Sequence, residues 1–307
     1  MHCYYLVFIL FNLVVLSGYA QDGHFEKRTI IYQDTLALDL FLPLDENLKA
    51  KPLLVYVHGG GFAGGRRDHP DHIQFCEYFA KRGWVTATVS YHLLMKGKSF
   101  GCDQDVRKKK ETIFLTAQNI NQSISYLIKN AKEFNLDPDK IVLSGSSAGA
   151  EAVIHAAYWD ETQINILPKD FKYAGVISMA GALLDENWIT KETAIPTALF
   201  HGTCDNLLPY GTASHHYCEA SEPGFMMLFG SHSIAMKLKS LDQGYYLISD
   251  CGGGHEWNEN PILPKYIHMV EGFLEKDVLR KTQRQIQQNL HEGSRDCQSK
   301  IDFCTND

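Results

Sequence analysis

The stretch Ile141-Val142-Leu143-Ser144-Gly145-Ser146-Ser147-Ala148-Gly149-Ala150-Glu151, written IVLSGSSAGAE, places three serines between an apolar run and an alanine-rich run. The apolar run predicts a buried strand, and the alanine-rich run predicts a helix. Most serines at such a junction only cap the helix or complete a turn. A serine presented on a sharp strand-to-helix bend needs residues without side chains two positions before and two positions after it, because the chain approaches itself closely there. Only Ser147, flanked by Gly145 and Gly149, meets this requirement.

Strand and helix patterns alternate on both sides of this stretch, from Leu53 to Leu279. Such alternation predicts a single α/β domain with a mostly parallel central sheet and helices on both faces. Before it, the residues on either side of Gln33-Asp34 alternate between apolar and polar, which predicts two antiparallel strands. We place this domain at residues 21–282. The polar segment 283–307 shows no apolar stripe, and we expect it to form a surface helix and a tail.

A second motif, His58-Gly59-Gly60-Gly61-Phe62, follows the predicted strand Leu53 to Val57. A flexible glycine turn is the simplest interpretation. Alternatively, the bare backbone N–H groups point at a negatively charged oxygen, which glycine favours because no side chain blocks the approach. In a parallel sheet both motifs would lie where strands end and helices begin, which is where binding sites form.

Composition and charge exclude several classes of protein. Of the 307 residues, 45% are hydrophobic and 21% charged, as in an ordinary globular protein, and the formal net charge is −7. This charge gives no support to a nucleic-acid-binding surface, which needs a basic patch. Residues 1–20 read as a signal peptide cleaved after Ala20, with an apolar core too short to span a bilayer. We therefore expect no membrane span after cleavage and a secreted or periplasmic location. An uncleaved anchor or a buried N-terminal segment is the alternative, because no Lys or Arg precedes the apolar run.

The two glycine-containing motifs together resemble the α/β-hydrolase superfamily, specifically the carboxylesterases and lipases that carry an HGGG loop. The resemblance extends from about Thr29 to Leu279, and within the group it is greatest to small exported bacterial esterases of the feruloyl or acetyl-xylan type. It implies the single-domain α/β-hydrolase fold and a nucleophile, an acid and a histidine in that chain order. It implies no cofactor and no metal. The chain departs from the best-known HGGG groups at Ser146, where those groups carry Asp or Glu.

Candidates for the acid and the histidine follow later predicted strands. Asp205 ends the run that begins at Ala198, and a loop continues it to Pro209; residues 198–209 look like the family's HGxxDxxVP segment. Competing acids fit less well: Asp185 and Glu186 follow an earlier strand, and Asp250 ends the next one. His255 closes a glycine-rich loop after that next strand and is the candidate base.

The resemblance implies that His255 takes the proton of Ser147, that Asp205 orients the imidazole, and that amides of Gly60, Gly61 and Ala148 bind the oxyanion. His58 is expected to hold the glycine loop.

A short segment, 183–194, replaces the lid of many relatives, which predicts an open cleft. Such a cleft suits esters with a short acyl group or a bulky alcohol, including polysaccharide-linked ones. A prolyl-oligopeptidase-like serine peptidase and an inactive binding module are the alternatives. The apolar residues 225–229 either line the pocket or, as we prefer, belong to the core.

Seven cysteines remain after signal cleavage, and an exported chain with so many is expected to form disulfides. The odd count leaves at least one unpaired or bound to another chain. The loops that carry Asp205 and His255 must converge, so we predict a Cys204–Cys251 disulfide. Cys297–Cys304 is the second candidate and Cys76–Cys102 the third. No cysteine and histidine spacing matches a zinc site.

Overall fold

The computed structural model describes residues 21–22, 24–44, 49–297 and 303–304. The predicted signal peptide, residues 1–20, lies outside them. None of the helices in the described part of the chain is both long enough and apolar enough to cross a lipid bilayer.

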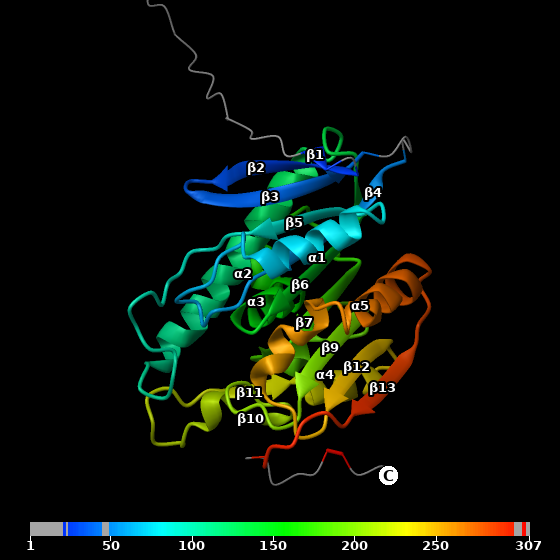
Figure 1. The fold of residues 1–307 in the computed structure, drawn as a ribbon. Helices are drawn as coiled ribbons and strands as arrows, with labels where there is room; N and C mark the ends of the chain where they lie inside the picture. Colours follow the sequence, from blue (N-terminus) through cyan, green and yellow to red (C-terminus); the bar gives the residue numbers. More distant parts are fainter. Residues whose placement is uncertain (1–20, 23, 45–48, 298–302, 305–307) are drawn as a thin grey trace, which may run out of the picture.

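One large twisted sheet forms the centre of the molecule (Figure 1). Its strands in the described residues are β1 Gln21–Asp22, β2 Phe25–Gln33, β3 Leu36–Pro43, β4 Lys51–Val57, β5 Val85–Val89, β6 Leu136–Ser146, β7 Gly175–Met179, β9 Thr197–Gly202, β12 Tyr245–Asp250 and β13 Gln285–Leu290. They lie in the order β1-β2-β3-β5-β4-β6-β7-β9-β12-β13. Pairing is parallel from β5 through to β13 and antiparallel among β1, β2, β3 and β5. A small second sheet has the order β10-β11-β8 and contains β8 Ala182–Leu183, β10 Thr212–Ser214 and β11 Met227–Gly230.

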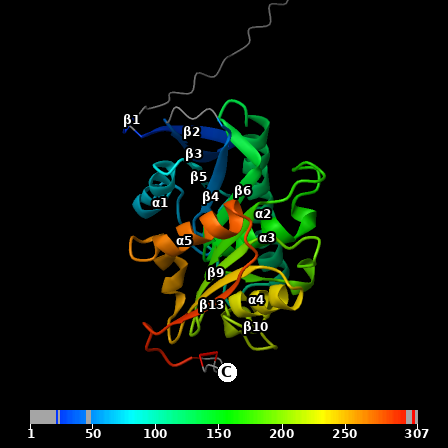
Figure 2. The same cartoon turned by 90° about the vertical axis from the view of Figure 1, so that its right-hand side faces the viewer.

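Helices cover both faces of the main sheet. They are α1 Pro70–Ala80, α2 Val106–Lys129, α3 Ala148–Tyr158, α4 Ser231–Ser240 and α5 Ile267–Phe273. Figure 2 shows α1 and α5 on one face and α2, α3 and α4 on the other. The two layers bury separate apolar cores, one containing Ile120 and Ile124 of α2, the other containing Phe75 of α1 and Phe273 of α5. The single-domain α/β-hydrolase fold predicted from the sequence is confirmed.

The sequence explains locally how the predicted β2–β3 hairpin turns and where the long helix α2 begins. The antiparallel strands β2 and β3 turn at Asp34, whose positive φ of 44° fits a tight turn. The long helix α2 begins after Asp105, whose carboxylate accepts a hydrogen bond of 2.8 Å from the amide of Arg107. An aspartate at this position satisfies one of the free N–H groups of the first turn, which explains why the helix starts here.

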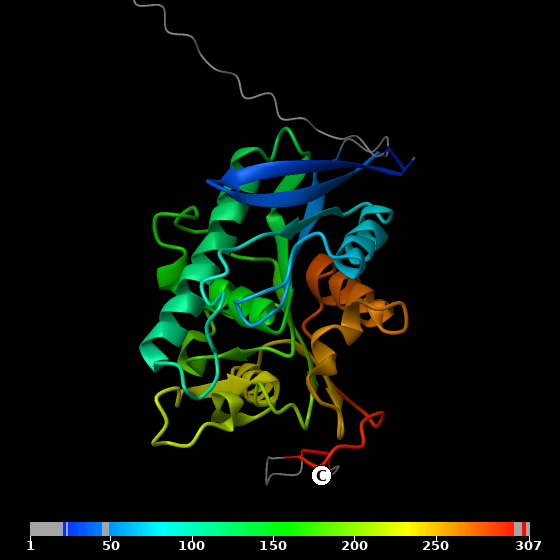
Figure 3. The same cartoon turned by 60° about the vertical axis from the view of Figure 1, so that its left-hand side comes forward.

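The expectation of a surface helix after residue 282 is wrong. Residues Gln285–Leu290 instead form β13, which pairs in parallel with β12 from Tyr245↔Gln285 to Asp250↔Leu290. In Figure 3 this last strand and the tail after it lie at the end of the molecule opposite the β2–β3 hairpin. The side chains of this edge strand are exposed or only partly buried, so they need no apolar stripe. The missing stripe therefore did not indicate a helix.

Candidate active site

Ser147 lies on the bend between β6 and α3, in a strained backbone conformation with φ 50° and ψ −121°. A left-handed φ is unusual for a residue with a side chain and persists only where the surroundings impose it. The surroundings here are backbone at close range. A Cβ on Gly145 would lie 2.4 Å from the carbonyl oxygen of Gly149, and a Cβ on Gly149 would lie 2.3 Å from that of Val57. The two glycines are thus required for the reason given from the sequence.

His255 brings its imidazole between Ser147 and Asp205. It stands in the loop after β12, at the start of the short 3₁₀ helix His255–Asn258. Its Nε2 lies 2.8 Å from Oγ of Ser147, and its Nδ1 lies 2.7 Å from Oδ2 of Asp205. The three residues selected from the sequence therefore form one continuous hydrogen-bonded chain, delivered by three loops at the carboxyl ends of β6, β9 and β12.

The carboxylate of Asp205 is buried and fully engaged. Only 1% of the residue is exposed. Oδ1 accepts hydrogen bonds from the amides of Leu207, at 2.8 Å, and Leu208, at 3.0 Å. Burial raises the pKa of Asp205, but hydrogen bonds and positive charge from His201 and His255 outweigh it and hold the pKa well below the usual range. Asp205 therefore stays ionised at neutral pH.

His201 contacts the same carboxylate and was not selected from the sequence. Its Nε2 lies 3.2 Å from Oδ2 of Asp205, and its Nδ1 lies 2.9 Å from Oγ of Ser231. The ring is completely buried in β9. With Nε2 protonated it donates to Asp205 and fixes the oxygen that also accepts from His255. It lies four residues before the acid, within the segment already singled out, but nothing in the sequence marks it as a hydrogen-bond donor.

The competing acids have structural roles elsewhere. Asp250 accepts hydrogen bonds from the indole of Trp257 at 2.9 Å and from the amide of Glu292 at 2.8 Å. Asp185 caps the 3₁₀ helix Glu186–Trp188 by accepting from the amide of Asn187. Neither these two nor Glu186 lines the pocket at Ser147.

The glycine loop after β4 lies against the bend that carries Ser147. The ring of His58 stacks on Tyr91 with 4.4 Å between centroids, and its Nδ1 donates to the carbonyl of Gly59 at 2.8 Å. Burial lowers the pKa of His58, so the ring is neutral and holds the loop. Among the described residues, the backbone N–H groups of Gly60, Gly61 and Ala148 have no hydrogen-bond acceptor. All three residues line the pocket next to Ser147.

The pocket at Ser147 has a volume of about 660 Å³. Backbone of the glycine loop forms one wall, and histidines, Phe100 and two leucines form much of the rest. The lining residues are His58, Gly59, Gly60, Gly61, Gly65, Arg66, His69, His72, Phe100, Ser147, Ala148, Glu151, Leu207, Leu208, His215, His216, His255, Asn258 and Glu259.

The apolar segment 225–229 lies apart from this pocket. Met226 and Leu228 are buried in the core, as preferred from the sequence, whereas Met227 is exposed. None of the five side chains lines the pocket around Ser147.

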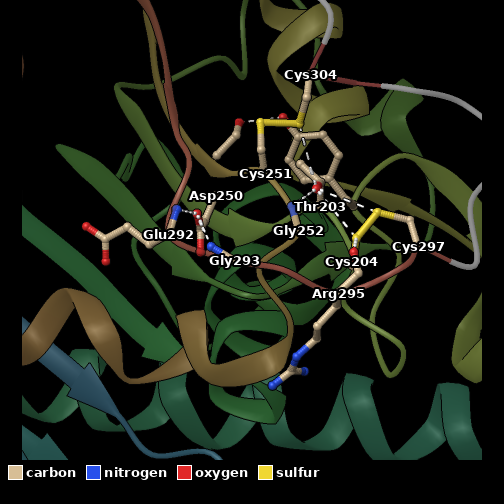
Figure 4. The surroundings of a disulfide bond; sticks show 12 residues. Thr203, Cys204, Asp250, Cys251, Gly252, Glu292, Gly293, Arg295, Cys297 and Cys304 are labelled. Carbon is tan, nitrogen blue, oxygen red and sulfur yellow. Dashed lines mark hydrogen bonds between the residues drawn. A yellow bond between two sulfur atoms is a disulfide. The ribbon is translucent and has the colours of Figure 1, made fainter.

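All three predicted disulfides are wrong. The structure pairs Cys204 with Cys297, Cys251 with Cys304 and Cys102 with Cys218, and it leaves Cys76 free and buried in α1. The loops before Asp205 and His255 do converge, because the amide of Cys204 donates to the carbonyl of Gly253 at 2.8 Å. However, Figure 4 shows Thr203 between the two cysteines, with its Oγ1 3.8 Å from Sγ of Cys297 and 3.9 Å from Sγ of Cys304. Each loop is therefore bonded to the C-terminal tail instead of to the other loop.

The same tail makes further contacts with the loop that carries His255. The amide of Arg295 donates to the carbonyl of Gly252 at 3.0 Å, and its guanidinium pairs with Glu256 at 2.9 Å. The ring of Phe303 packs on Tyr210, with 4.9 Å between centroids. Residues after β13 thus hold both loops in place.

The remaining disulfide, Cys102–Cys218, joins the loop of Phe100 to that of His215 and His216 at the rim of the pocket. Glu222 lies close enough to its sulfur atoms for the three to resemble a metal-binding group. Sulfurs joined in a disulfide are not thiolates, so this group does not suit a metal ion.

We expect the double variant Cys204→Ala/Cys297→Ala to lose about 2 to 5 kcal/mol in free energy of unfolding, measured by urea denaturation without reductant. The matched control is Cys102→Ala/Cys218→Ala, which opens a loop of similar length at the pocket rim and leaves the loop of Asp205 bonded to the tail. Stability should fall comparably in both, whereas the turnover of esters should fall further in the first. Peptide mapping without reductant should recover Cys204 linked to Cys297; a fragment linking Cys204 to Cys251 would contradict the pairing.

Comparisons with known proteins agree with this architecture. The model of the BD-FAE family matches residues 38–183. The apo form of Thermogutta terrifontis esterase 2 superposes with a TM-score of 0.58, covering 81% of this chain and 94% of that one at 20% identity. The chain has the α/β-hydrolase fold. Its parallel sheet and its strained serine between β6 and α3 agree with this fold.

Curated relatives of this chain match over part of their length. Secreted lipase 5 of Gibberella zeae is 27% identical over 45% of this chain and 26% of its own length. Gut esterase 1 of Caenorhabditis elegans is 25% identical over 54% of this chain and 27% of its own length. Chlorogenic acid esterase of Aspergillus niger is 27% identical over 49% of this chain and 28% of its own length. The matched regions thus span about a quarter of the relatives' length.

Proposed function

We propose that this α/β hydrolase is a serine esterase that cleaves carboxylic esters through an acyl-enzyme. The observation that carries the proposal is the hydrogen-bonded chain from Ser147 through His255 to Asp205, which opens into a pocket. A hydroxyl group becomes a nucleophile when an adjacent base takes its proton, and the base works only when a third group orients it. His255 and Asp205 lie at hydrogen-bond distance for these two roles.

The reaction follows from the positions of these groups. Oγ of Ser147 attacks the ester carbonyl carbon while Nε2 of His255 takes the hydroxyl proton. The tetrahedral intermediate collapses, the alcohol leaves with the proton from His255, and Ser147 keeps the acyl group. Water then attacks the acyl-enzyme with His255 as base, and the acid is released. Asp205 remains ionised throughout and stabilises the imidazolium.

The negative oxygen of the intermediate needs donors that are already in place, because such donors cost no reorganisation during reaction. We propose the amides of Gly60, Gly61 and Ala148 for this role. Two observations support this role: all three residues line the pocket beside Ser147, and their amides have no acceptor among the described residues.

The proposed substrates are esters with a short acyl group or a bulky alcohol, including esters linked to polysaccharides. No residue of segment 183–194 lines the pocket, and Trp188 of this segment stacks on Trp159, after α3, with 4.7 Å between centroids. The names of the relatives, among them a secreted lipase and a chlorogenic acid esterase, agree with ester hydrolysis outside the cytoplasm. Three disulfides further support export to an oxidising compartment, either secreted or periplasmic.

A panel of p-nitrophenyl esters of rising acyl length, with a peptide p-nitroanilide beside it, tests this proposal. We expect the highest kcat/KM for the acetate or butyrate, a steep fall towards the palmitate, and no cleavage of the peptide substrate. Acetylated and feruloylated sugars then test the alcohol side. Cleavage of long acyl chains alone would contradict the proposed substrate class, and preference for the peptide would contradict the proposed reaction.

A further inference from the structure

Glu151 lies one helical turn beyond Ser147 in α3, and its amide donates to the carbonyl of Ser147 at 2.9 Å. Residues four apart share a face of a helix, and side chains lean towards the helix N-terminus. The carboxyl group therefore leans towards the end of α3 that carries Ser147. It lines the same pocket as Ser147 and His255.

One oxygen of this carboxyl has no partner in the described part of the chain. The residue is 2% exposed, and its Oε1 is buried without a hydrogen-bond partner. The nearest opposite charge is on Lys109 of α2, but its ammonium donates to the carbonyls of Gly224, at 3.0 Å, and Gly101, at 3.4 Å. A buried polar atom without a partner costs on the order of 1 to 3 kcal/mol, so its presence needs an explanation.

The charge state of Glu151 limits what it can bind. Burial raises the pKa of Glu151 to about 8; the charge of Lys109 opposes this shift and that of Asp205 adds to it. Near neutral pH the group is therefore mostly a neutral carboxylic acid, with one O–H donor and one carbonyl acceptor. A neutral acid attracts a cationic ligand poorly, and Lys109 would repel one. The matching partner is a neutral group that both donates and accepts, as a hydroxyl does.

We propose that Glu151 determines specificity by binding a hydroxyl group of the ester substrate, in the same pocket in which Ser147 attacks the carbonyl. This inference rests on the proposed esterase function and adds the chemical class of substrate. A site that hydrogen-bonds a substrate hydroxyl rejects the analogue without it, because the buried group of the protein is then left unpaired. One such bond corresponds to a preference on the order of 10- to 100-fold in kcat/KM.

Matched ester pairs that differ by one hydroxyl group measure this preference. On the acyl side, p-nitrophenyl butanoate is compared with its 2-hydroxy and 3-hydroxy derivatives; on the alcohol side, ethyl butanoate is compared with 2-hydroxyethyl butanoate by titrating the acid released. The readout is the ratio of kcat/KM within each pair, in which any loss of active enzyme cancels. We expect at least one ratio of ten or more for the wild type, a largely retained ratio for Glu151→Gln and a ratio near one for Glu151→Leu.

Glu151→Leu is close in size and removes the unsatisfied group, and Glu151→Met serves if the leucine variant does not fold. If the carboxyl is only structural, both Gln and Leu variants shift the melting temperature and leave every ratio unchanged, which would overturn the proposal. No preference for any hydroxylated ester in the wild type would also overturn it. Failure of the esterase function itself looks different, since the wild type would then hydrolyse neither member of any pair.

Discussion

Replacing Ser147 with alanine is expected to lower kcat for p-nitrophenyl acetate by roughly 10⁴- to 10⁶-fold. Without Oγ no acyl-enzyme forms, and His255 has no proton to take. The amides of the glycine loop and the pocket remain, so a small rate above that of the uncatalysed reaction should persist. A fluorophosphonate probe, which reacts covalently with an activated serine, should label the wild type once and leave Ser147→Ala unlabelled by intact-mass measurement.

The two neighbouring serines are the matched controls. Ser144 donates to the carbonyl of Val55 at 2.9 Å, within the sheet, and Ser146 is buried beside the glycine loop. Neither lines the pocket. Ser144→Ala and Ser146→Ala should therefore keep the probe reaction. Labelling of Ser147→Ala at the wild-type rate would show that the nucleophile is another residue and would remove the basis of the proposed mechanism.

We expect Asp205→Asn to lower kcat by about 10⁴-fold while leaving KM nearly unchanged. The carboxylate accepts from four donors, two amides on Oδ1 and two imidazoles on Oδ2. An asparagine turns one of these oxygens into a donor. Facing His255, its NH₂ group forces the proton to Nε2, where the ring donates to Ser147 instead of taking its proton. Facing the amides of Leu207 and Leu208, it leaves both without an acceptor.

Measurements of kcat across pH, with Asp185→Asn as the control, test this expectation. Asp185 caps a short helix away from the pocket, so its variant changes one carboxylate without touching His255. Should Asp205→Asn turn over esters as fast as Asp185→Asn, the acid lies elsewhere. Circular dichroism and the melting temperature of both variants show whether a loss of rate reflects a loss of fold.

Local requirements of the backbone explain why the sequence predicted so much of the candidate site. Gly145 and Gly149 are needed because carbonyl oxygens approach within 2.4 Å of where a Cβ would stand, and this need appears in the sequence as a fixed spacing around Ser147. Asp205 and His255 each follow a strand of the parallel sheet, so the topology alone brings them to one edge. The fold followed from the same alternation of strands and helices.

Contacts between distant segments were the part that the sequence did not predict. Proximity of the Cys204 and Cys251 loops was correctly inferred, but the side chain of Thr203 lies between their sulfurs, and no pattern in the sequence reveals this. The strand β13 is polar because it forms an edge, which removed the periodicity that would have identified it. His201 was overlooked because a buried histidine in a strand has no spacing that distinguishes a hydrogen-bond donor from a core residue.

The tail that carries Cys297 and Cys304 follows every residue of the proposed triad in the chain. When Asp205 and His255 leave the ribosome, the segment that secures their loops has not yet been made, and afterwards its bonds still need an oxidant. A newly made chain in a reducing cytosol would thus have its triad residues without the covalent ties that hold two of them. With the proposed export, these ties would form only after delivery to an oxidising compartment, which would limit premature hydrolysis of the cell's own esters.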